Sequence, residues 1–574
     1  MLNDEIAGIF ERMARVLSFK GANRFRIIAY ERAAQALTDV SEDLTAMARD
    51  DRLKEIPGIG ADLEGMIREY IRTKRIRKYD DEREGISDEL IELMGIPGLG
   101  PKTLAQLHEK LGVSSLQDLK RALESDSRPA IPGFGDKKVE NLRRGVELWQ
   151  SRRQRLPLGS ALPLAERLLD HVRRVRGVDE ADLAGSLRRR LETIGDIDVV
   201  VAAADRATAL KAIVRLPEVR EVLALGDTKA TILIENNLQV DVRAVDPESY
   251  GAALQYFTGS KQHNVHLRTL ARRDGLKINE YGVFRGEKRL GGSTEEDVYR
   301  LMGMPLMPPE IREDRGEIEA ASAGALPALV DLAGIRGDLH VHSDHSDGRA
   351  TMAEMAEAAE RLGYEYLAIA DHSPSARVAR GLDEERLAEK IEEFERLRSA
   401  RRKKRPRLLL GAEVDILPDG SLDYPDKTLS RFDVVTASIH SAFKQSRDSM
   451  TGRLLDAISN PHVHIIGHPT ARLIGSRDPV AFDLDRVIRA AVDRGVALEI
   501  NASPLRLDLN DTMCRAAGEA GALVAINSDA HSAPQLEQMR YGVFQARRGW
   551  IGAGSVVNCR NLAKLTEWLQ RRKR

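Results

Sequence analysis

The chain has 574 residues, which is too long for a single hydrophobic core, so we expect several domains. Its 42% hydrophobic and 31% charged residues are typical of a globular protein and argue against a fibrous or disordered chain. No apolar run reaches the ~18 residues that cross a bilayer, and the first residues are acidic and amphipathic, so we expect neither a membrane span nor a signal peptide. Cys514 and Cys559 have no metal-binding or redox spacing, which predicts a reducing cytoplasm.

Basic residues cluster in the first third of the chain, although the formal net charge is only -1. Solvated helix faces often carry such runs, so these clusters alone do not establish nucleic-acid binding. Histidine has the opposite distribution, because nine of the thirteen histidines lie at or beyond His340. We therefore expect the two ends of the chain to carry out different chemistry. The basic clusters are KRIRK at 74–78, KK at 137–138, SRRQR at 151–155 and RRR at 188–190.

One turn motif occurs three times, as IPGIG at 56–60, IPGLG at 96–100 and IPGFG at 131–135. A tight turn before a helix directs backbone N–H groups outward, where they bind a phosphate without reading a base. One copy could be an ordinary helix connector, but three copies beside basic residues favour contact with a DNA backbone. These segments resemble helix-hairpin-helix motifs. Their candidate DNA-binding glycines are Gly58, Gly60, Gly98, Gly100, Gly133 and Gly135.

Two carboxylates, Asp196 and Asp198, lie two residues apart in a strand-like run of isoleucine and valine. Side chains at i and i+2 share one face of a strand, so these acids repel each other unless a cation lies between them. Downstream, residues 228–245 predict a hairpin that turns at Asn236 and Asn237 and carries Asp241 on its second strand. Three such acids can hold two Mg²⁺ (or Mn²⁺), the arrangement used for phosphoryl or nucleotidyl transfer.

Two further segments surround these acids. Upstream, AGSLRRR at 184–190 offers a glycine for close backbone approach, a serine hydroxyl, and Arg188 or Arg189 for a phosphate. Downstream, residues 254–284 begin LQYFTGSKQHNVHLR. With these motifs, the chain from its first residues to about residue 315 resembles the family X DNA polymerases.

The resemblance implies roles for individual residues. Asp196, Asp198 and Asp241 would be the catalytic, metal-binding carboxylates. Tyr256 and Phe257 would lie against the sugar of the incoming nucleotide and exclude ribose. The full set of nucleotide-binding residues implied by the family is Arg155, Gly185, Ser186, Arg189, Tyr256, Phe257, Gly259, Asn264 and Arg268.

At one position the chain departs from relatives that have 5′-deoxyribose-phosphate lyase activity. Those relatives form a Schiff base through a lysine after the first hairpin turn, and the alignment places Met66 there. A thioether cannot form an imine, so we expect weak or absent lyase activity. Binding of a 5′-phosphate is still expected, through the first hairpins and Lys20, Arg24 and Arg26.

The C-terminal part combines histidines and carboxylates with strand-like segments. IRGDLHVHSDHSDG begins this part at 335–348, and later apolar runs such as LAIADHS each end in a histidine or an acid. Alternation of these runs with helical segments predicts a β/α barrel, whose ligands would lie at the C-terminal ends of the strands. A single histidine after a strand is usually structural, but a set at successive strand ends indicates more than one metal ion.

This part resembles a PHP (polymerase and histidinol phosphatase) domain, over roughly 336–574. The resemblance implies up to three ions, Zn²⁺ and/or Mn²⁺, and a complete ligand set favours phosphoester hydrolysis. His345, His462 and His464 do not fit the ligand spacing. The implied metal ligands are His340, His342, Asp347, His372, Glu413, His440, His468, Asp529 and His531.

The predicted fold class is a multidomain combination of α+β and α/β units. It comprises helical helix-hairpin-helix domains, a nucleotidyltransferase palm with a thumb, and a distorted β/α (TIM-like) PHP barrel. The predicted segments are an N-terminal helical DNA-binding domain at 1–80, a fingers-type helical domain at 81–155, the palm at 156–260, the thumb at 261–317, a linker at 318–335 and the barrel at 336–574.

The predicted function is gap filling in base excision repair by a family X polymerase of the bacterial and archaeal type, with a metal-dependent 3′→5′ exonuclease or related 3′-end phosphoesterase in the barrel. Its expected partners are gapped or primed DNA with a 5′-phosphate and dNTPs, without a membrane. We expect a monomer in the cytoplasm, at the nucleoid. Two alternatives stay open: a polymerase with a purely structural PHP domain, and a non-catalytic scaffold that binds DNA ends.

Overall fold

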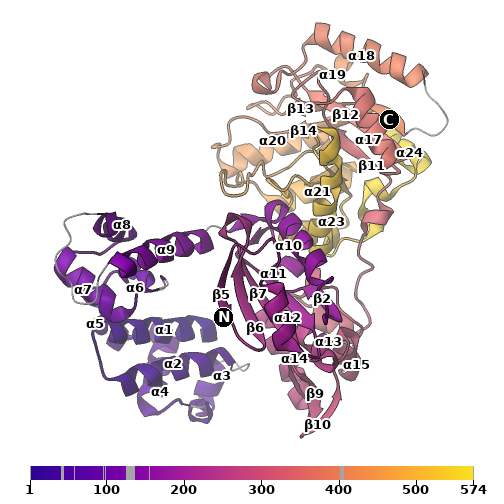
Figure 1. Cartoon of the computed structure of the whole chain (residues 1–574). Helices are drawn as coiled ribbons and strands as arrows, with labels where there is room; N and C mark the ends of the chain where they lie inside the picture. The colour runs from indigo at the N-terminus through magenta and orange to yellow at the C-terminus, as the bar shows by residue number, and fades with distance from the viewer. Residues whose placement is uncertain are drawn as a thin grey trace.

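The computed structural model describes residues 2–39, 44–56, 58–94, 96, 98–124, 136–153, 155–400 and 406–572. Along the chain, a group of helices is followed by a mixed α/β region and then by a barrel of parallel strands (Figure 1). This order confirms the predicted fold class. Within the described residues, no helix combines the length and apolar character needed to cross a membrane.

The N-terminal helices pack around one buried apolar cluster that extends from Ile6 to Val146. The predicted boundary at residue 80 lies within α5, and helices on both sides of it contribute to this cluster. The helices are α1 (Leu2–Phe19), α2 (Arg24–Asp39), α3 (Leu44–Arg49), α4 (Ala61–Thr73), α5 (Arg77–Glu82), α6 (Asp88–Leu93), α7 (Pro101–Leu111), α8 (Leu116–Glu124) and α9 (Asp136–Arg153).

The first two repeated turns have the same backbone conformation. Gly58 and Gly98 have φ angles of 85° and 84°, which favour glycine, and Gly60 and Gly100 are the N-cap residues of α4 and α7. A Cβ added at Gly60 or Gly100 would meet no atom within 4 Å, so the space in front of both helix starts is open. The third turn, with Gly133 and Gly135, lies outside the described residues.

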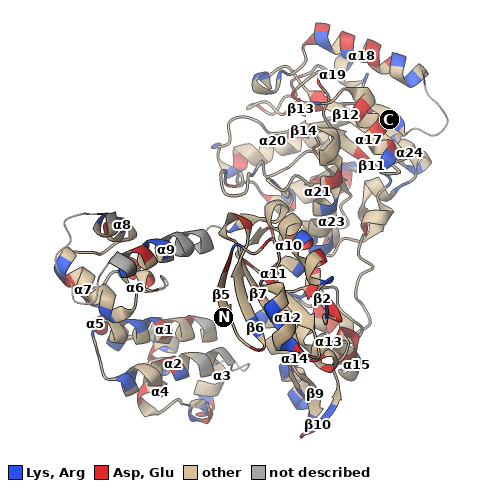
Figure 2. Ribbon diagram, in the orientation of Figure 1, with Lys and Arg blue, Asp and Glu red and all other residues tan. Residues whose placement is uncertain are grey.

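Basic and acidic residues are both present on these helices (Figure 2). In the KRIRK cluster, Arg75 pairs with Asp80 at 3.0 Å and Lys78 with Asp62 at 3.4 Å. Part of the positive charge expected from the sequence is therefore compensated within the fold.

The palm contains, among its described residues, a five-stranded sheet with the order β2-β4-β7-β6-β5. β4 and β7 are adjacent and parallel, and the turn between β6 and β7 contains Asn236 and Asn237, both with positive φ. The predicted hairpin is therefore present. The elements are β1 (Leu156–Pro157), α10 (Leu158–Val172), β2 (Glu180–Leu183), α11 (Gly185–Arg188), β3 (Thr193–Ile194), β4 (Asp196–Ala202), α12 (Arg206–Ile213), β5 (Glu221–Leu225), β6 (Lys229–Leu233), β7 (Gln239–Val245) and α13 (Tyr250–Thr258).

The thumb packs against the palm through a buried charged cluster. Arg188 and Arg312 both bind Glu295, at 2.7 and 2.5 Å, and the two guanidinium groups lower the pKa of Glu295 to about 2 in spite of its burial. The thumb and the following segment comprise α14 (Lys261–Arg273), β8 (Lys277–Asn279), β9 (Gly282–Arg285), β10 (Lys288–Gly291), α15 (Glu295–Leu301) and α16 (Glu317–Ser322).

The barrel has, in the part of the chain that is described, seven parallel strands that neighbour each other in chain order, from β11 to β17. A bridge between Val341 and Ala530 brings the first and last strands together. The elements are β11 (Gly337–Val341), α17 (Met352–Arg361), β12 (Tyr366–His372), α18 (Glu384–Ser399), β13 (Arg407–Asp415), α19 (Asp426–Leu429), β14 (Val434–Ser438), α20 (Arg447–Ser459), β15 (Ile465–Ile466), α21 (Leu484–Arg494), β16 (Ala497–Asn501), α22 (Asp511–Glu519), β17 (Val524–Asn527), α23 (Met539–Arg548) and α24 (Leu562–Arg572).

The barrel and the palm share a continuous interface along α23 and α10 (Figure 1). Leu507 and Tyr541 of the barrel belong to the same buried apolar cluster as the palm core. Ion pairs surround this apolar contact, and they join Arg472 to Glu192, Arg540 to Glu166, Arg547 to Glu310 and Arg548 to Glu313.

Gly159 of α10 tests how tightly this interface is packed. A Cβ at this position would lie 2.3 Å from the Cβ of Pro504 in the barrel, so Gly159→Ala forces the two parts apart. We expect a loss of about 1–3 kcal/mol of stability, typical of overpacking, and earlier proteolytic cleavage between palm and barrel.

Gly65→Ala in α4 is the matched control, because a Cβ there meets no atom within 4 Å. It should leave the melting temperature unchanged or raise it, since alanine is the better helix former by up to ~1 kcal/mol. Equal melting temperatures for Gly159→Ala and the unmodified protein would contradict the tight interface.

Candidate active sites

The three palm carboxylates come together because β4 and β7 are parallel neighbours. Asp198 pairs in register with Asp241, and Asp196 lies two residues earlier on the same face of β4. Burial and the neighbouring charges of Asp196 and Asp241 raise the pKa of Asp198 to about 7. Burial and Asp241 also raise the pKa of Asp196. The site therefore concentrates negative charge that a cation would relieve.

Two features of the palm hold these acids in place. Lys229 Nζ lies 2.8 Å from Asp241 Oδ2, and the Thr231 hydroxyl donates to Asp241 Oδ1 at 2.7 Å. Gly185 has a φ of 60°, and a Cβ added there would lie 2.1 Å from Asp198 Oδ2. Only glycine leaves room for the Asp198 carboxylate at this position.

The arginines expected at the triphosphate have partners within the protein. Arg189 binds the Thr258 carbonyl and pairs with Glu313 at 3.1 Å, and its neighbour Arg188 is held by Glu295. Arg155 donates to the Thr193 hydroxyl at 2.8 Å, beside the loop that leads to Asp196. Ser186 follows Gly185 in the short helix α11.

The remaining predicted nucleotide-binding residues lie on α13 and α14. The rings of Tyr256 and Phe257 meet edge to face, with centroids 5.2 Å apart. The Asn264 amide donates to the Tyr256 carbonyl at 2.7 Å, so the start of α14 is tied to the end of α13. Arg268 contacts the Asn264 carbonyl at 3.3 Å, and Gly259 has a φ of 69° next to the Arg189 guanidinium.

In the barrel, predicted ligands surround the buried Glu413. His372 ends β12 in register with Glu413 on β13, and His372 Nδ1 lies 2.9 Å from Glu413 Oε2. The Nε2 atoms of His340, His440 and His468 lie 3.4, 3.3 and 2.9 Å from oxygens of the same carboxylate. In spite of burial, these imidazoles hold the pKa of Glu413 well below its usual range.

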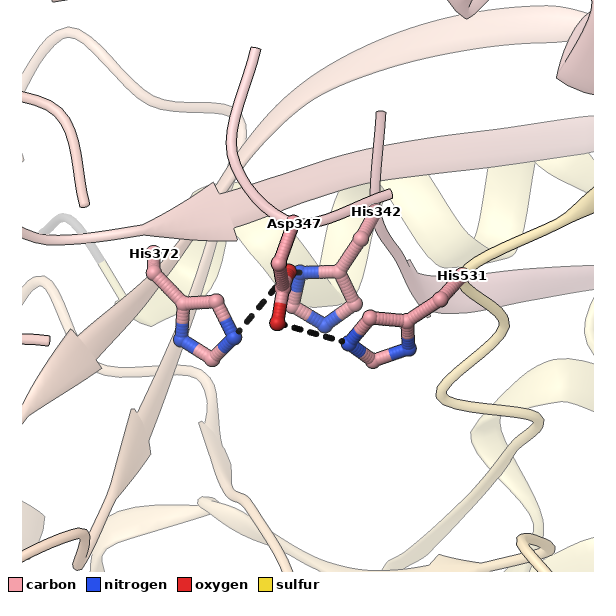
Figure 3. A group of neighbouring side chains, drawn as sticks. All are labelled: His342, Asp347, His372 and His531. Atoms are coloured by element: carbon pink, nitrogen blue, oxygen red, sulfur yellow. Dashed lines mark ion pairs between the residues drawn. The ribbon is translucent and has the colours of Figure 1, made fainter. Parts of the chain in front are cut away.

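Asp347 forms a second centre beside the first (Figure 3). His372 Nε2 lies 3.6 Å from Asp347 Oδ1, and His531 Nε2 lies 3.3 Å from Asp347 Oδ2. The stacked ring of His342 links this centre to Asp529, whose Oδ1 lies 3.1 Å from His342 Nε2. The structure thus brings the nine predicted barrel residues into one continuous cluster.

The donor set fits metal ions. Imidazole nitrogens and carboxylate oxygens are the ligands of Zn²⁺, Mn²⁺ and Fe, and three groups of these residues have ligand atoms within 4.8 Å of one another. Burial without a hydrogen bond is costly for such atoms, and coordination of a cation would satisfy them. Among the described residues, several buried atoms make no hydrogen bond, although some of them lie close to a neighbour without hydrogen-bond geometry. They include His340 Nε2, His342 Nδ1, His372 Nδ1, His468 Nδ1 and Glu413 Oε1.

Sequence reasoning missed the residues that orient these ligands. Glu499 Oε1 lies 2.7 Å from His340 Nδ1, and Asp415 Oδ1 lies 2.5 Å from His440 Nδ1. Asn501 donates to both Glu499 and Asp529, at 3.1 and 3.0 Å. The available signal was an acid inside an apolar strand, as in ALEIN, where burial requires a charged partner.

The histidines that do not fit the ligand spacing lie elsewhere. His345 Nε2 contacts Glu393 at 3.0 Å, and His464 accepts a hydrogen bond from the Val435 backbone N–H. His462 is partly buried. The metal-binding groups found among the described residues contain none of these three.

Family models match successive parts of the chain. The matches are a helix-hairpin-helix domain at 1–76, a SAM-like helix-hairpin-helix tandem at 90–147, a DNA polymerase beta thumb at 253–313 and a PHP domain at 338–503.

Among curated proteins, the DNA polymerase/3′-5′ exonuclease PolX of Bacillus subtilis (strain 168) is 38% identical over 576 residues, covering 100% of both chains. The chain belongs to the PolX family. This confirms the resemblance to family X polymerases that carry a C-terminal PHP domain.

Two further relatives each match only part of the chain. A probable phosphatase of Thermoanaerobacter sp. (strain X514) is 30% identical over 254 residues, which are 41% of this chain and 95% of the phosphatase. DNA polymerase lambda of Arabidopsis thaliana is 27% identical over 348 residues, which are 54% of this chain and 62% of that polymerase.

Asp198 predicts that the stability of the metal-free protein changes with pH. Its pKa in the folded protein, about 7, lies above the ordinary value of 3.8, so ionisation opposes folding and stability falls as the pH rises through this interval. Asp198→Asn removes that cost. In EDTA, the substitution should raise the melting temperature more at pH 8 than at pH 5.

With Mg²⁺ at pH 8, the unmodified protein should melt at the higher temperature. The ion stabilises its palm, whereas the Asp198→Asn variant lacks one of the ligands for the ion. An equal effect of Asp198→Asn at both pH values would mean that the carboxylate cluster is not strained.

Proposed function

We propose that the chain is a DNA-directed DNA polymerase that fills short gaps in base excision repair and also removes nucleotides from 3′ ends with its PHP barrel. The observation that carries this proposal is the presence of two separate clusters of metal-ligating side chains in one chain. One is the carboxylate group on β4 and β7, and the other is the histidine-rich group at the ends of the barrel strands.

At the palm, Asp196, Asp198 and Asp241 would hold Mg²⁺ or Mn²⁺. Bound there, the ions would neutralise charge on the triphosphate and favour attack by the primer 3′-hydroxyl. Tyr256 and Phe257 would form the surface against which the sugar lies. The triphosphate would meet Gly185, Ser186 and the two predicted arginines, Arg155 and Arg189.

Two donor atoms of Arg189 already have acceptors. Its Nη1 donates to the Thr258 carbonyl and its Nε to Glu313, so a triphosphate would bind through the remaining N–H groups or replace these acceptors. Asn264 and Arg268 would face the new base pair from α14. These two residues distinguish a templated polymerase from a simple nucleotidyltransferase.

At the barrel, the nine predicted ligands would hold up to three ions, Zn²⁺ and/or Mn²⁺. Such ions would supply an activated water and bind the oxygens of a 3′-terminal phosphodiester. Glu499 and Asp415 would fix the ring orientation of His340 and His440, as carboxylates commonly do for metal-binding histidines.

The proposed substrate is gapped or primed DNA with a 5′-phosphate, together with dNTPs. The open space before α4 and α7 suits a DNA backbone, which would contact Gly58, Gly60, Gly98 and Gly100. The proposed location is the nucleoid in the cytoplasm, and the proposed oligomeric state is a monomer. The six predicted segments are the proposed domains.

A polymerase with a structural PHP domain and a non-catalytic DNA-end scaffold are the alternatives. Both would tolerate loss of barrel ligands, whereas all nine predicted positions have metal-ligating side chains. The orphaned ring nitrogens of the barrel also favour a loaded metal site over a structural core.

The main test of this function is whether each of the two activities can be lost without the other. Asp196→Ala with Asp198→Ala removes palm ligands, so primer extension should fall by orders of magnitude while 3′-end degradation persists. His340→Ala with His342→Ala should have the reverse effect. Extension and degradation assays on each purified variant make the comparison, and a thermal melt controls for loss of the fold.

Degradation that disappears with the palm acids and persists without the barrel histidines would assign the exonuclease to the polymerase site. Loss of neither activity in either variant would contradict both proposed sites.

The N-terminal helices should prefer gaps with a 5′-phosphate. Glu82 already occupies two of the predicted receivers, since it pairs with Lys20 at 3.4 Å and with Arg26 at 2.5 Å. Glu82→Gln frees these cations, so it should strengthen binding to a 5′-phosphorylated gap by several-fold at low salt.

Fluorescence anisotropy with and without the 5′-phosphate measures the effect. Glu92→Gln in α6, on the same group of helices, is the control for loss of an acidic charge. If Glu82→Gln strengthens binding equally to gaps with and without the 5′-phosphate, then these residues do not bind the 5′-phosphate.

A further inference from the structure

The loop at 503–508 connects the barrel cavity with the palm. It follows β16, at the same ends of the barrel strands where the predicted metal ligands lie. Pro504 and Leu507 face the palm, against Gly159 and in the palm core respectively. Arg506, between them, lines the barrel cavity. One short loop therefore contacts both halves of the molecule.

The cavity has the size and lining of a site for a phosphate ester. Its volume is about 450 Å³, and it is lined by seven of the nine predicted ligands together with Arg506 and the segment 375–379. Two arginines line the described cavity, namely Arg377, which is exposed, and Arg506. A negatively charged substrate in this cavity would meet it.

The Arg506 guanidinium is placed for a ligand that the protein does not supply. Its Nε lies 3.6 Å from Asp529 Oδ2, which is longer than a hydrogen bond. Its Nη1 is buried and has no hydrogen-bond partner among the described residues. Nη1 is enclosed by protein, so a phosphate in the cavity would be met by the part of Arg506 that lines it, and a guanidinium matches phosphate oxygens in both charge and geometry.

Arg472 ties the same loop to the palm. Its Nε donates to the Arg506 carbonyl at 2.8 Å, and Nη2 also binds the Leu507 carbonyl. Its guanidinium binds the Glu192 carboxylate in a bidentate manner, at 3.1 and 2.5 Å. Glu192 lies in the palm segment that leads to Asp196, and the Gln545 side chain of α23 also donates to Glu192 Oε1, at 2.8 Å.

We propose that Arg506 binds the phosphate of the 3′-terminal phosphodiester in the barrel cavity, and that Glu192 of the palm positions it through Arg472. The inference rests on the proposed exonuclease function of the barrel and adds a substrate-binding residue that is not a metal ligand. It also means that the hydrolytic site is completed by contact with the polymerase half of the chain.

The first test compares Arg506→Ala and Arg506→Lys in the full chain, with Mn²⁺ and a 5′-labelled single-stranded oligonucleotide. Loss of a donor to the reacting phosphate should lower kcat/KM for degradation on the order of 100-fold in the alanine variant, with partial activity in the lysine variant. Millimolar guanidinium should restore part of the Arg506→Ala activity. Metal content and primer extension should be unchanged.

Arg396→Ala, which removes an arginine that is 68% exposed on α18, is the matched control and should degrade DNA at the normal rate. If Arg506→Ala melts at a lower temperature, the lysine variant and the guanidinium rescue show whether the missing guanidinium or the lower stability causes the loss of activity. Degradation by Arg506→Ala within twofold of normal, while His340→Ala with His342→Ala is inactive, would overturn the role of Arg506. Degradation that persists without those histidines would instead overturn the proposed function.

The second test is a palm substitution with a barrel readout. Glu192→Gln keeps the shape of the side chain and removes the charge that holds Arg472, so degradation should fall several-fold. Glu235→Gln is the matched control, because it removes a palm carboxylate that pairs with Arg167 and has no role in either site, and it should leave degradation intact. Normal degradation by Glu192→Gln, with a normal melting temperature, would show that the palm does not position Arg506.

Discussion

The structure depends on pairing its buried carboxylates with cations or hydrogen-bond donors. An ionised carboxylate taken out of water costs several kcal/mol unless a cation or hydrogen-bond donors replace the solvent. In the barrel, Glu413 is 1% exposed and is met by four imidazoles. In the palm, Lys229 meets Asp241, while burial and mutual repulsion raise the pKa of Asp198 to about 7. Both sites are arranged so that metal ions complete the balance.

The same constraint explains how the barrel is attached. At the interface, Arg472, Arg547 and Arg548 of the barrel pair with Glu192, Glu310 and Glu313 of the polymerase half. Removal of either member of such a pair leaves the other charge without its partner, which is more costly than never having the pair. The barrel is therefore integrated with the palm, and contact across the interface reaches the loop that carries Arg506.

Much of the architecture could be predicted from local patterns. Alternation of side chains along a strand placed Asp196 and Asp198 on one face, and the Asn236–Asn237 turn identified the strand that carries Asp241. In the barrel, the rule that ligands follow parallel strands brought residues far apart in sequence to one end. These rules depend only on local spacing and on the order of the strands, so they can be applied to a single sequence.

Partners distant in sequence could not be predicted in this way. Arg188 and Arg189 looked free to bind a phosphate, but Glu295, 107 residues from Arg188, and Glu313, 124 residues from Arg189, occupy them. Glu499 and Arg506 also lacked a recognisable motif, because their roles come from the side chains that the fold places beside them. A charged residue inside an apolar run indicates that a partner exists without identifying it.

The most direct test of two separate metal centres in one chain is a crystal structure with Mn²⁺, with data collected at the manganese absorption edge. The account predicts anomalous density between Asp196, Asp198 and Asp241, and a second group of peaks among Glu413, Asp347 and the barrel histidines. Occupied palm carboxylates with no ion in the barrel, after loading with both Mn²⁺ and Zn²⁺, would contradict it.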